Sequence, residues 1–240
     1  MKDKNITIFI IISILLLVLI LFSLLLASFV GIDFGSDNEV SVLNQTSDGM
    51  VGSSLRDPLM TQAVEIYAAT IRTNDPLRGD RDASLYILEF GDFECPYCSS
   101  MNQVLISVLA DYEGEVSLVW KDFPNPSHLQ ARTAALAARC AGKQGKFWQY
   151  HDMLFENQDD LSRELYNQIA LELDLKLDDF NQCLEGKEFI SEVGQGLVDG
   201  QGLEVNATPY LFIGNSRIDM AISAAELKRI IDLELLKLRR

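Results

Sequence analysis

The chain has 240 residues and a formal net charge of −15 at pH 7, from 20 lysine and arginine residues against 35 aspartate and glutamate residues. Nucleic-acid binding needs a basic surface, so this charge excludes nucleic acid as an expected partner. Four cysteines and two histidines, with a single Cys-x-x-Cys spacing, do not assemble a four-ligand zinc site, and no metal is expected.

The chain begins with a short basic segment and a long apolar run, residues 6–30. At about 1.5 Å per residue, a helix of this length exceeds a hydrocarbon core of roughly 30 Å, and it is too long for a cleaved signal peptide. Lys2 and Lys4 precede the run, and no base follows it until Arg56. Basic residues that flank a membrane span are retained on its cytoplasmic side. The sequence therefore predicts a cytoplasmic segment 1–5, a single-pass signal anchor in the cell membrane, and a domain on the extracytoplasmic side, where disulfides persist.

The anchor is followed by a predicted flexible linker, residues 31–58, which is rich in Ser, Asn, Gln, Asp and Gly and has no regular period. Residues 59–240 form one predicted domain. Its first apolar segment, residues 60–71, has helical spacing, but residues 66–71 fit an edge strand equally well. Arg78-Gly79-Asp80 is predicted as a turn.

The motif Cys95-Pro96-Tyr97-Cys98 stands between a predicted strand, Leu85–Phe90, and a predicted helix, Ser99–Tyr112. Two thiols at this spacing can close a disulfide, and a helix N-terminus favours a thiolate over a thiol. Cys95 is therefore the candidate nucleophile and Cys98 the candidate resolving thiol. The Cys95–Cys98 pair itself carries the electrons, so no separate cofactor is expected.

Two carboxylates lie close to this motif in the sequence. Glu89 stands in the apolar strand six residues before Cys95. Burial would disfavour its charged form, which suits proton transfer through water to Cys98; a polar gap at the sheet edge is the alternative. Glu94 is expected to be exposed, with its charge opposing the helix dipole.

Residues 126–201 have helical spacing of apolar residues over a length that exceeds one crossover helix. They follow a predicted third strand, Val116–Phe123, and are therefore predicted to be an inserted helical subdomain. His128 is expected at a helix start, and His151 is expected to be structural, with a functional role as the alternative. The predicted helical segments are Leu129–Ala141, Phe147–Phe155, Leu161–Leu173 and Phe180–Leu184.

The last part of the chain predicts a β-hairpin and a helix. Tyr210–Ile213 and Ser216–Ile218 are joined by a two-residue glycine turn. Ser223–Glu226 has the pattern of a capping box. The helix that follows is expected to place four residues on one apolar face: Leu227, Ile231, Leu235 and Leu238.

From about Asp75 to its end, the chain resembles the thioredoxin superfamily, and specifically its membrane-tethered DsbA-like thiol:disulfide oxidoreductases. The resemblance implies an α/β, thioredoxin-like fold with an inserted helical subdomain. It implies a catalytic role for Glu89 and for a cis Pro209 beside Cys95, and substrate binding by Thr208 and Pro96. Tyr97 and Phe93 are expected to bind substrate as part of an exposed apolar collar, since clustered exposed aromatic side chains around a site favour binding. The matching segments are Glu89–Cys98, Lys121–Pro124, Gly145–His151 and Ala207–Pro209.

Cys140 and Cys183 both lie in the helical block. The resemblance, together with an even number of cysteines outside the cell, implies a structural disulfide between them. Two buried free thiols and a second redox relay are the alternatives.

The expected function is that of a membrane-tethered thiol:disulfide oxidoreductase that forms or shuffles disulfides in extracytoplasmic proteins. Its expected partners are unfolded or reduced extracytoplasmic proteins and a membrane redox protein that re-oxidises the dithiol. A disulfide reductase is one alternative. A non-enzymatic tethered chaperone or adaptor is another, and it would need neither Cys95 nor Pro209.

Overall fold

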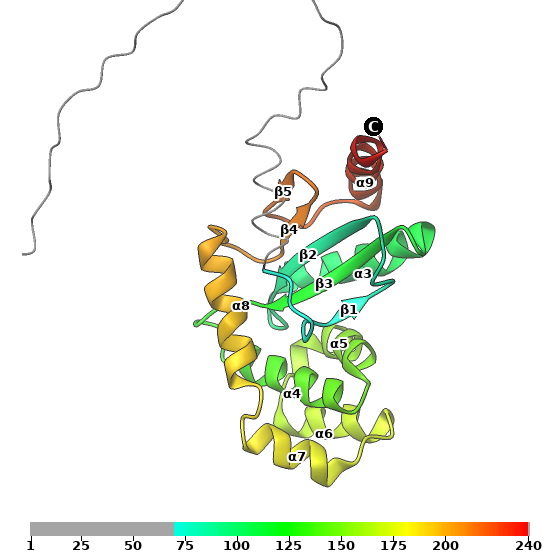
Figure 1. Ribbon diagram of the computed structural model, residues 1–240. Helices are drawn as coiled ribbons and strands as arrows, with labels where there is room; N and C mark the ends of the chain where they lie inside the picture. Colours follow the sequence, from blue (N-terminus) through cyan, green and yellow to red (C-terminus); the bar gives the residue numbers. More distant parts are fainter. Residues whose placement is uncertain (1–69, 240) are drawn as a thin grey trace, which may run out of the picture. The chain divides into compact units, whose positions relative to one another are not determined.

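The computed structural model describes residues 70–239, which are built around a five-stranded sheet with strand order β1-β3-β2-β4-β5 (Figure 1). Strands β2 and β3 are parallel, and the other neighbouring pairs are antiparallel. The strands are β1 (Leu77–Arg78), β2 (Leu85–Gly91), β3 (Val116–Asp122), β4 (Tyr210–Ile213) and β5 (Ser216–Ile218).

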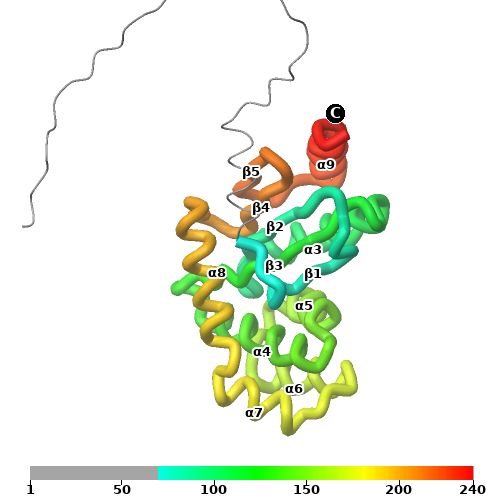
Figure 2. The backbone as a smooth tube through the Cα atoms, in the orientation of Figure 1, coloured from blue at the N-terminus to red at the C-terminus, as the bar shows by residue number. Residues whose placement is uncertain are grey.

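Seven α-helices and two short 3₁₀ turns complete the described part of the chain, and Figure 2 traces their path. None of these helices is long and apolar enough to cross a bilayer. The predicted segments 1–5, 6–30 and 31–58 lie outside the described residues. The helical elements are α3 (Pro96–Leu109), η1 (Ala110–Tyr112), α4 (Ala131–Lys143), α5 (Phe147–Glu156), η2 (Gln158–Asp160), α6 (Arg163–Glu172), α7 (Leu177–Glu185), α8 (Ile190–Gly202) and α9 (Ala224–Leu238).

Strand β2 lies in the middle of the sheet and is covered on both faces. Successive side chains of a strand point to opposite faces, so Ile87 and Glu89 lie on one face of β2 and Leu88 and Phe90 on the other. Helices α3 and α9 pack on the Ile87 face, whereas Leu203 and other apolar residues after α8 pack on the Leu88 face. The predicted strands at β2, β3, β4 and β5 are confirmed. The predicted turn at residues 78–80 is only partly right, because Arg78 belongs to the short edge strand β1, which pairs with β3.

Helix α9 begins as predicted, since the Ser223 hydroxyl accepts a hydrogen bond from the Glu226 amide at 3.3 Å. The other half of the capping box is absent, because the Glu226 carboxylate binds Arg229. The expected apolar face is wrong at its last position. The Leu238 side chain is 58% exposed, since the helix ends at this residue and the sheet packs only against the earlier turns.

Helices α4 to α7 form the predicted helical subdomain, and in the view of Figure 1 they gather below the sheet, whereas α9 lies above it. A disulfide between Cys140 of α4 and Cys183 of α7 joins two of these helices, with 5.9 Å between the Cα atoms. The pairing implied by the resemblance is therefore present. Closing a loop of 43 residues restricts the unfolded chain and contributes about 4 kcal/mol in the chain-entropy account.

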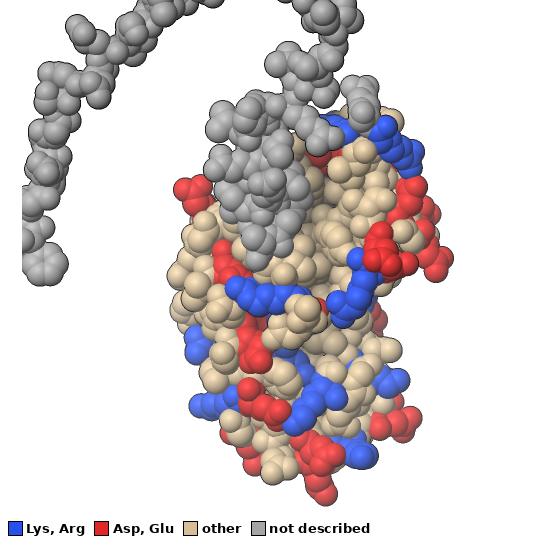
Figure 3. All heavy atoms as spheres, viewed as in Figure 1, with Lys and Arg blue, Asp and Glu red and all other residues tan. Residues whose placement is uncertain are grey.

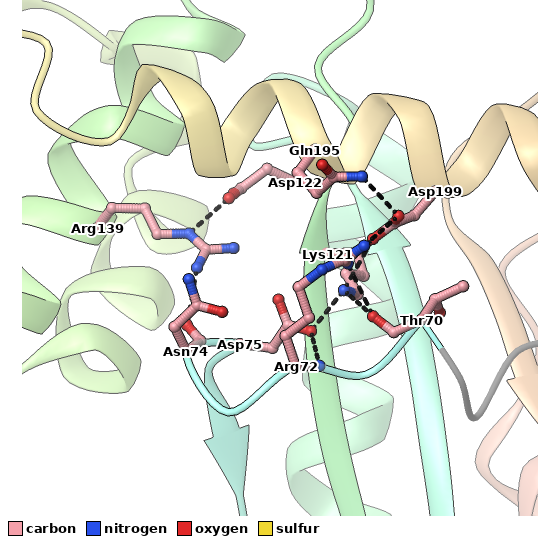
Figure 4. A network of polar contacts seen from close by, with 9 residues as sticks. All are labelled: Thr70, Arg72, Asn74, Asp75, Lys121, Asp122, Arg139, Gln195 and Asp199. Carbon is pink, nitrogen blue, oxygen red and sulfur yellow. Dashed lines mark hydrogen bonds and ion pairs between the residues drawn. The ribbon is translucent and has the colours of Figure 1, made fainter.

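Helix α8 returns the chain from the helical subdomain to the sheet. Gly196 allows its close approach, because a Cβ atom there would lie 2.2 Å from the Asp122 carbonyl oxygen. Buried Lys121 of β3 binds Asp199 of α8 at 3.1 Å and Asp75 at 2.5 Å (Figure 4). Arg72 also pairs with Asp199. These ion pairs hold the start of the described chain and α8 against the end of β3.

Charged side chains cover much of the surface. On the face seen in Figure 3, lysine and arginine side chains lie among aspartate and glutamate side chains. The exposed ion pairs of residues 70–239 include Lys143–Glu188 at 2.7 Å and Arg239–Glu115 at 2.8 Å. Exposed pairs of this kind contribute only about 0–1 kcal/mol each, so the core and the disulfide dominate stability.

Candidate active site

Cys95 is the N-cap residue of α3, and Pro96 occupies the first turn. Proline is tolerated there because the first helical N–H groups have no partner within the helix. The helix therefore starts three residues earlier than the predicted Ser99. Both thiols are free, with Cys95 5% exposed and Cys98 fully buried one turn into the helix. Cys95 is therefore the thiol of the pair that a substrate can reach more easily.

A segment more than a hundred residues away completes this surface. Strand β4 pairs antiparallel with β2, and this register brings the residues before β4 to the end of β2. The Cys95 Sγ atom lies 3.3 Å from the Thr208 carbonyl oxygen. The Thr208–Pro209 peptide bond is cis, as the resemblance implied.

The two thiols have opposite pKa shifts. A hydrogen bond from the Cys98 side chain lowers the pKa of Cys95 to about 5, with further help from Thr208 and from the Cys98 and Tyr97 backbone amides, while burial opposes the shift. Burial raises the pKa of Cys98, and the hydrogen bond to Cys95 and the charge of Glu89 raise it further. At neutral pH Cys95, the less buried thiol, is therefore a thiolate, and Cys98 behind it is a thiol.

Glu89 lies in the centre of the sheet on the face that α3 covers. It is 1% exposed, and desolvation raises its pKa to about 8 although the charge of Arg78 opposes the shift. The alternative of a polar gap at the sheet edge is wrong, because β2 is a central strand. Glu89 is thus a protonated acid at neutral pH, close enough to Cys98 for its charge to affect that thiol.

Comparison with known proteins agrees with this arrangement. The profile of the family described as Thioredoxin matches residues 72–233. The chain belongs to this family. Among solved structures, BdbD from Bacillus subtilis in its oxidised form has 26% identity and a TM-score of 0.63, over 68% of this chain and 94% of that one. The α-DsbA2 protein from Wolbachia pipientis, at 20% identity and a TM-score of 0.66, shares the fold over 76% of this chain and 99% of that one. The fold is thus that of the DsbA-like members.

Curated relatives at higher identity match this chain over only part of their own length. This chain is 34% identical in sequence to the Na(+)/H(+) antiporter NhaA 1 of Mycolicibacterium vanbaalenii over 161 residues. The aligned segment covers 66% of this chain and 26% of the antiporter. The NhaA 3 antiporter of Salinispora tropica is 35% identical over 60% of this chain and 22% of its own length. The chain therefore spans about a quarter of the length of the curated relatives that it matches.

Glu94 of this thioredoxin-family site is not the exposed residue that the sequence predicted. Its carboxylate is half-buried and accepts hydrogen bonds from the backbone amides of Gln130 and Ala131, at 2.6 Å and 3.0 Å. These amides belong to the first turn of α4, whose N-cap residue provides no side-chain acceptor. The charge of Glu94 is therefore offset by the N-terminus of α4 rather than directed against α3.

Asp92 is a site residue that sequence reasoning missed. Its buried carboxylate accepts hydrogen bonds from the backbone amides of Glu94 at 2.7 Å and Asn125 at 2.8 Å. It also contacts His128 Nδ1 at 2.7 Å, so His128 lies in the loop beside the active site, before α4 begins. An aspartate side chain that accepts a hydrogen bond from the amide two residues later forms a common turn. This local signal could have indicated the contact of Asp92 with the Glu94 amide, but not its contact with Asn125.

The expected substrate-binding residues divide into two groups. Tyr97 is 66% exposed and Pro96 is also exposed, so both are available to a substrate. Phe93 is buried against Trp120 and Phe155, with ring centroids 5.1 Å away in both cases. Its predicted place in an exposed apolar collar is therefore wrong, because this aromatic cluster buries it. Leu129, next to the Gln130 amide that binds Glu94, is also exposed, at 85%.

His151 and Gln158 lie behind the active-site loop. His151 is fully buried in the same aromatic cluster, 4.6 Å from the Trp120 ring. The Gln158 side chain donates hydrogen bonds to the carbonyl oxygens of Phe93 and Cys95, at 2.7 Å and 2.9 Å. Within residues 70–239, no group of three or more His, Cys, Asp or Glu residues is placed to hold a metal ion.

In the reduced protein, alkylation of Cys95 is expected to have a midpoint near pH 5. Replacing Cys98 with Ala should raise that midpoint, because the hydrogen bond from Cys98 is the largest cause of the shift. Cys98→Ser keeps a donor and is the matched control. The rate of iodoacetamide modification between pH 3 and 10 measures both, and a wild-type midpoint near the ordinary value of about 8.5 would contradict the assignment.

Proposed function

We propose that the protein is a thiol:disulfide oxidoreductase of the DsbA type, which forms or shuffles disulfides in extracytoplasmic proteins. One observation carries the proposal: Cys95 and Cys98 are free thiols at the N-terminus of α3, and Cys95 Sγ lies 3.3 Å from the Thr208 carbonyl oxygen. The opposite pKa shifts of the two thiols support it. A surface thiolate is a good leaving group and a buried thiol is protected from side reactions. Both properties suit thiol–disulfide exchange.

The reaction starts from the Cys95–Cys98 disulfide. A substrate thiolate attacks Cys95 Sγ, a mixed disulfide forms, and Cys98 leaves as a thiolate that takes a proton from Glu89. A second substrate thiolate attacks the substrate sulfur of the mixed disulfide and releases Cys95 as a thiolate. The substrate has then lost two electrons and gained a disulfide, while the enzyme holds a dithiol that a membrane redox partner must re-oxidise.

The lowered pKa of Cys95 favours the oxidising direction. Stabilising the Cys95 thiolate stabilises the reduced enzyme, which makes its disulfide a stronger oxidant. Disulfide reduction is the rival direction within the same chemistry. The position of the Thr208 carbonyl beside Cys95 favours substrates that present extended, unfolded chain, since main-chain pairing there is independent of sequence.

We also propose that residues 6–30 anchor the protein in the cell membrane, with the N-terminus in the cytoplasm and the active site outside. The apolar run and the basic residues Lys2 and Lys4 support this topology. Protease added to spheroplasts should remove the domain and leave a short membrane-bound fragment. Full protection of the domain would contradict the proposed topology.

The proposed activity is tested with the oxidised full-length protein and a reduced, unfolded ribonuclease as substrate. We expect stoichiometric amounts of the protein to form disulfides in the substrate, and catalytic amounts to do so when glutathione disulfide is supplied. Cys95→Ser should be inactive. If this variant retains wild-type activity in promoting substrate refolding, the dithiol is incidental and the adaptor alternative is correct.

A further inference from the structure

The buried side-chain polar atoms that have no hydrogen-bond partner within residues 70–239 include Glu89 Oε1, Asn102 Oδ1, Trp148 Nε1 and His151 Nε2. They come from β2, α3 and α5, and none is used in the exchange reaction except that of Glu89. A buried polar atom without a partner costs free energy, and ordered water is the usual partner when several such atoms lie together.

These atoms lie on one side of the sheet and lead away from Cys98. Asn102 follows Cys98 by one helical turn and therefore lies on the same face of α3. The Asn102 side-chain amide donates to Asp152 Oδ1 at 3.4 Å, and His151 Nδ1 contacts the same oxygen at 2.9 Å. The His151 and Trp148 rings are 4.9 Å apart. Trp120, the partner of Glu89 on β3, has its ring centroid 4.6 Å from that of His151, so the group extends from beside Glu89 to a carboxylate near the surface.

That carboxylate, Asp152, is partly exposed to solvent. Asp152 binds Arg78 at 2.6 Å, and the two side chains are 27% and 21% exposed. Arg78 also lines a surface hollow of about 980 Å³ beside Ile106 and Leu109, in the C-terminal half of α3. Cys95 caps the other end of this helix, which at about 1.5 Å per residue is roughly 20 Å long.

We propose that Asn102, His151 and Asp152, with water between them, form a proton path that connects Glu89 to solvent at the Arg78 end of α3. The inference rests on the proposed exchange reaction. In that reaction Glu89 gives its proton to the Cys98 thiolate when the mixed disulfide forms. A bound substrate covers the Cys95 surface at that moment, so the proton that restores Glu89 arrives from the opposite side.

The hydrogen bonds define what each side chain does in this path. His151 is neutral, since burial lowers its pKa, and its Nδ1–H donates to Asp152 while its Nε2 is left as an acceptor for water. Asn102 donates to Asp152 and leaves its Oδ1 as an acceptor for water. They act on Cys98 through Glu89 and are positioning residues for proton transfer. The charged groups that affect His151 are Asp152 on α5, Arg78 on β1 and Asp122 on β3. Glu89 on β2 acts on Cys98 of α3.

The test compares Asn102→Leu and Asp152→Asn with Glu156→Gln, which changes an exposed carboxylate on the same helix as Asp152. The Asp152 variant is isosteric and half-exposed, so it addresses the path even if the buried Asn102 variant folds poorly. Turnover of reduced ribonuclease by the full-length protein is measured across pH 5–9 in H₂O and D₂O. Both path variants should lose roughly tenfold in kcat with KM unchanged and show a larger deuterium effect, within the range of general acid–base contributions.

The Cys95 alkylation midpoint should stay at its wild-type value in both path variants, because the path does not touch that thiol. Wild-type kcat and deuterium effect in both variants, beside an active wild-type protein, would overturn the proton path and leave the exchange activity standing. Inactivity of the wild-type protein would instead refute the proposed function. A high-resolution crystal structure with no water between Glu89 and Asn102 would also overturn the path.

Discussion

Cys98→Ser is expected to accumulate mixed disulfides between Cys95 and substrate proteins, whereas Cys95→Ser is expected to form none. The Cys95 sulfur is the one at the surface, and burial and its raised pKa keep Cys98 from attacking a substrate. Without Cys98, no internal thiol can resolve the mixed disulfide, so the complex persists. Non-reducing gel electrophoresis of cells acid-quenched and alkylated with a thiol reagent measures the complexes.

The double variant Cys95→Ser/Cys98→Ser is the control for trapping through the other two cysteines. It should behave like Cys95→Ser, because Cys140 and Cys183 are joined to each other in a disulfide. Turnover should fall to background in all three variants. Equal trapping by the two single variants would reject the division of labour between the two thiols.

Glu89→Gln is expected to make the protein more stable and less active at the same time. In the folded protein Glu89 titrates near pH 8, whereas in the unfolded chain it titrates near its ordinary value of about 4.3. Between these two values the unfolded state gains the charge and the folded state does not, so the free energy of unfolding falls as pH rises. The cost is about 1.4 kcal/mol for each pH unit and reaches a few kcal/mol by pH 8.

The variant removes this cost, so the stability difference between Glu89→Gln and wild type should be smallest below pH 4, grow up to about pH 8 and then level off. Urea unfolding of both proteins at several pH values measures it. Turnover should fall roughly 100-fold, because glutamine cannot donate a proton to Cys98. Glu113→Gln, which changes an exposed carboxylate, is the matched control. Parallel stability curves for Glu89→Gln and wild type would show that Glu89 is ionised in the folded state.

Much of the fold, the Cys95–Cys98 pair and the burial of Glu89 could be predicted from the sequence, because their causes are local. The spacing of Cys95 and Cys98, a proline in the first turn and an apolar strand just before them predict a redox pair at a helix N-terminus. Glu89 is buried because its neighbours in the strand are apolar, and that pattern is visible in sequence. The helical periods of the inserted subdomain and the glycine turn between β4 and β5 are equally local signals.

Tertiary structure decided the features that depend on pairings across the fold. The Glu94 carboxylate accepts hydrogen bonds from amides 36 and 37 residues later in the sequence, and Asp92 binds an amide 33 residues later. Phe93 stands between two acidic residues in the sequence but is buried by Trp120 of a strand and Phe155 of a helix. The Thr208 carbonyl reaches Cys95 only because β4 pairs with β2. Hydrophobic spacing determines which elements form, but the surroundings of a polar or aromatic side chain depend on which distant elements the fold brings beside it.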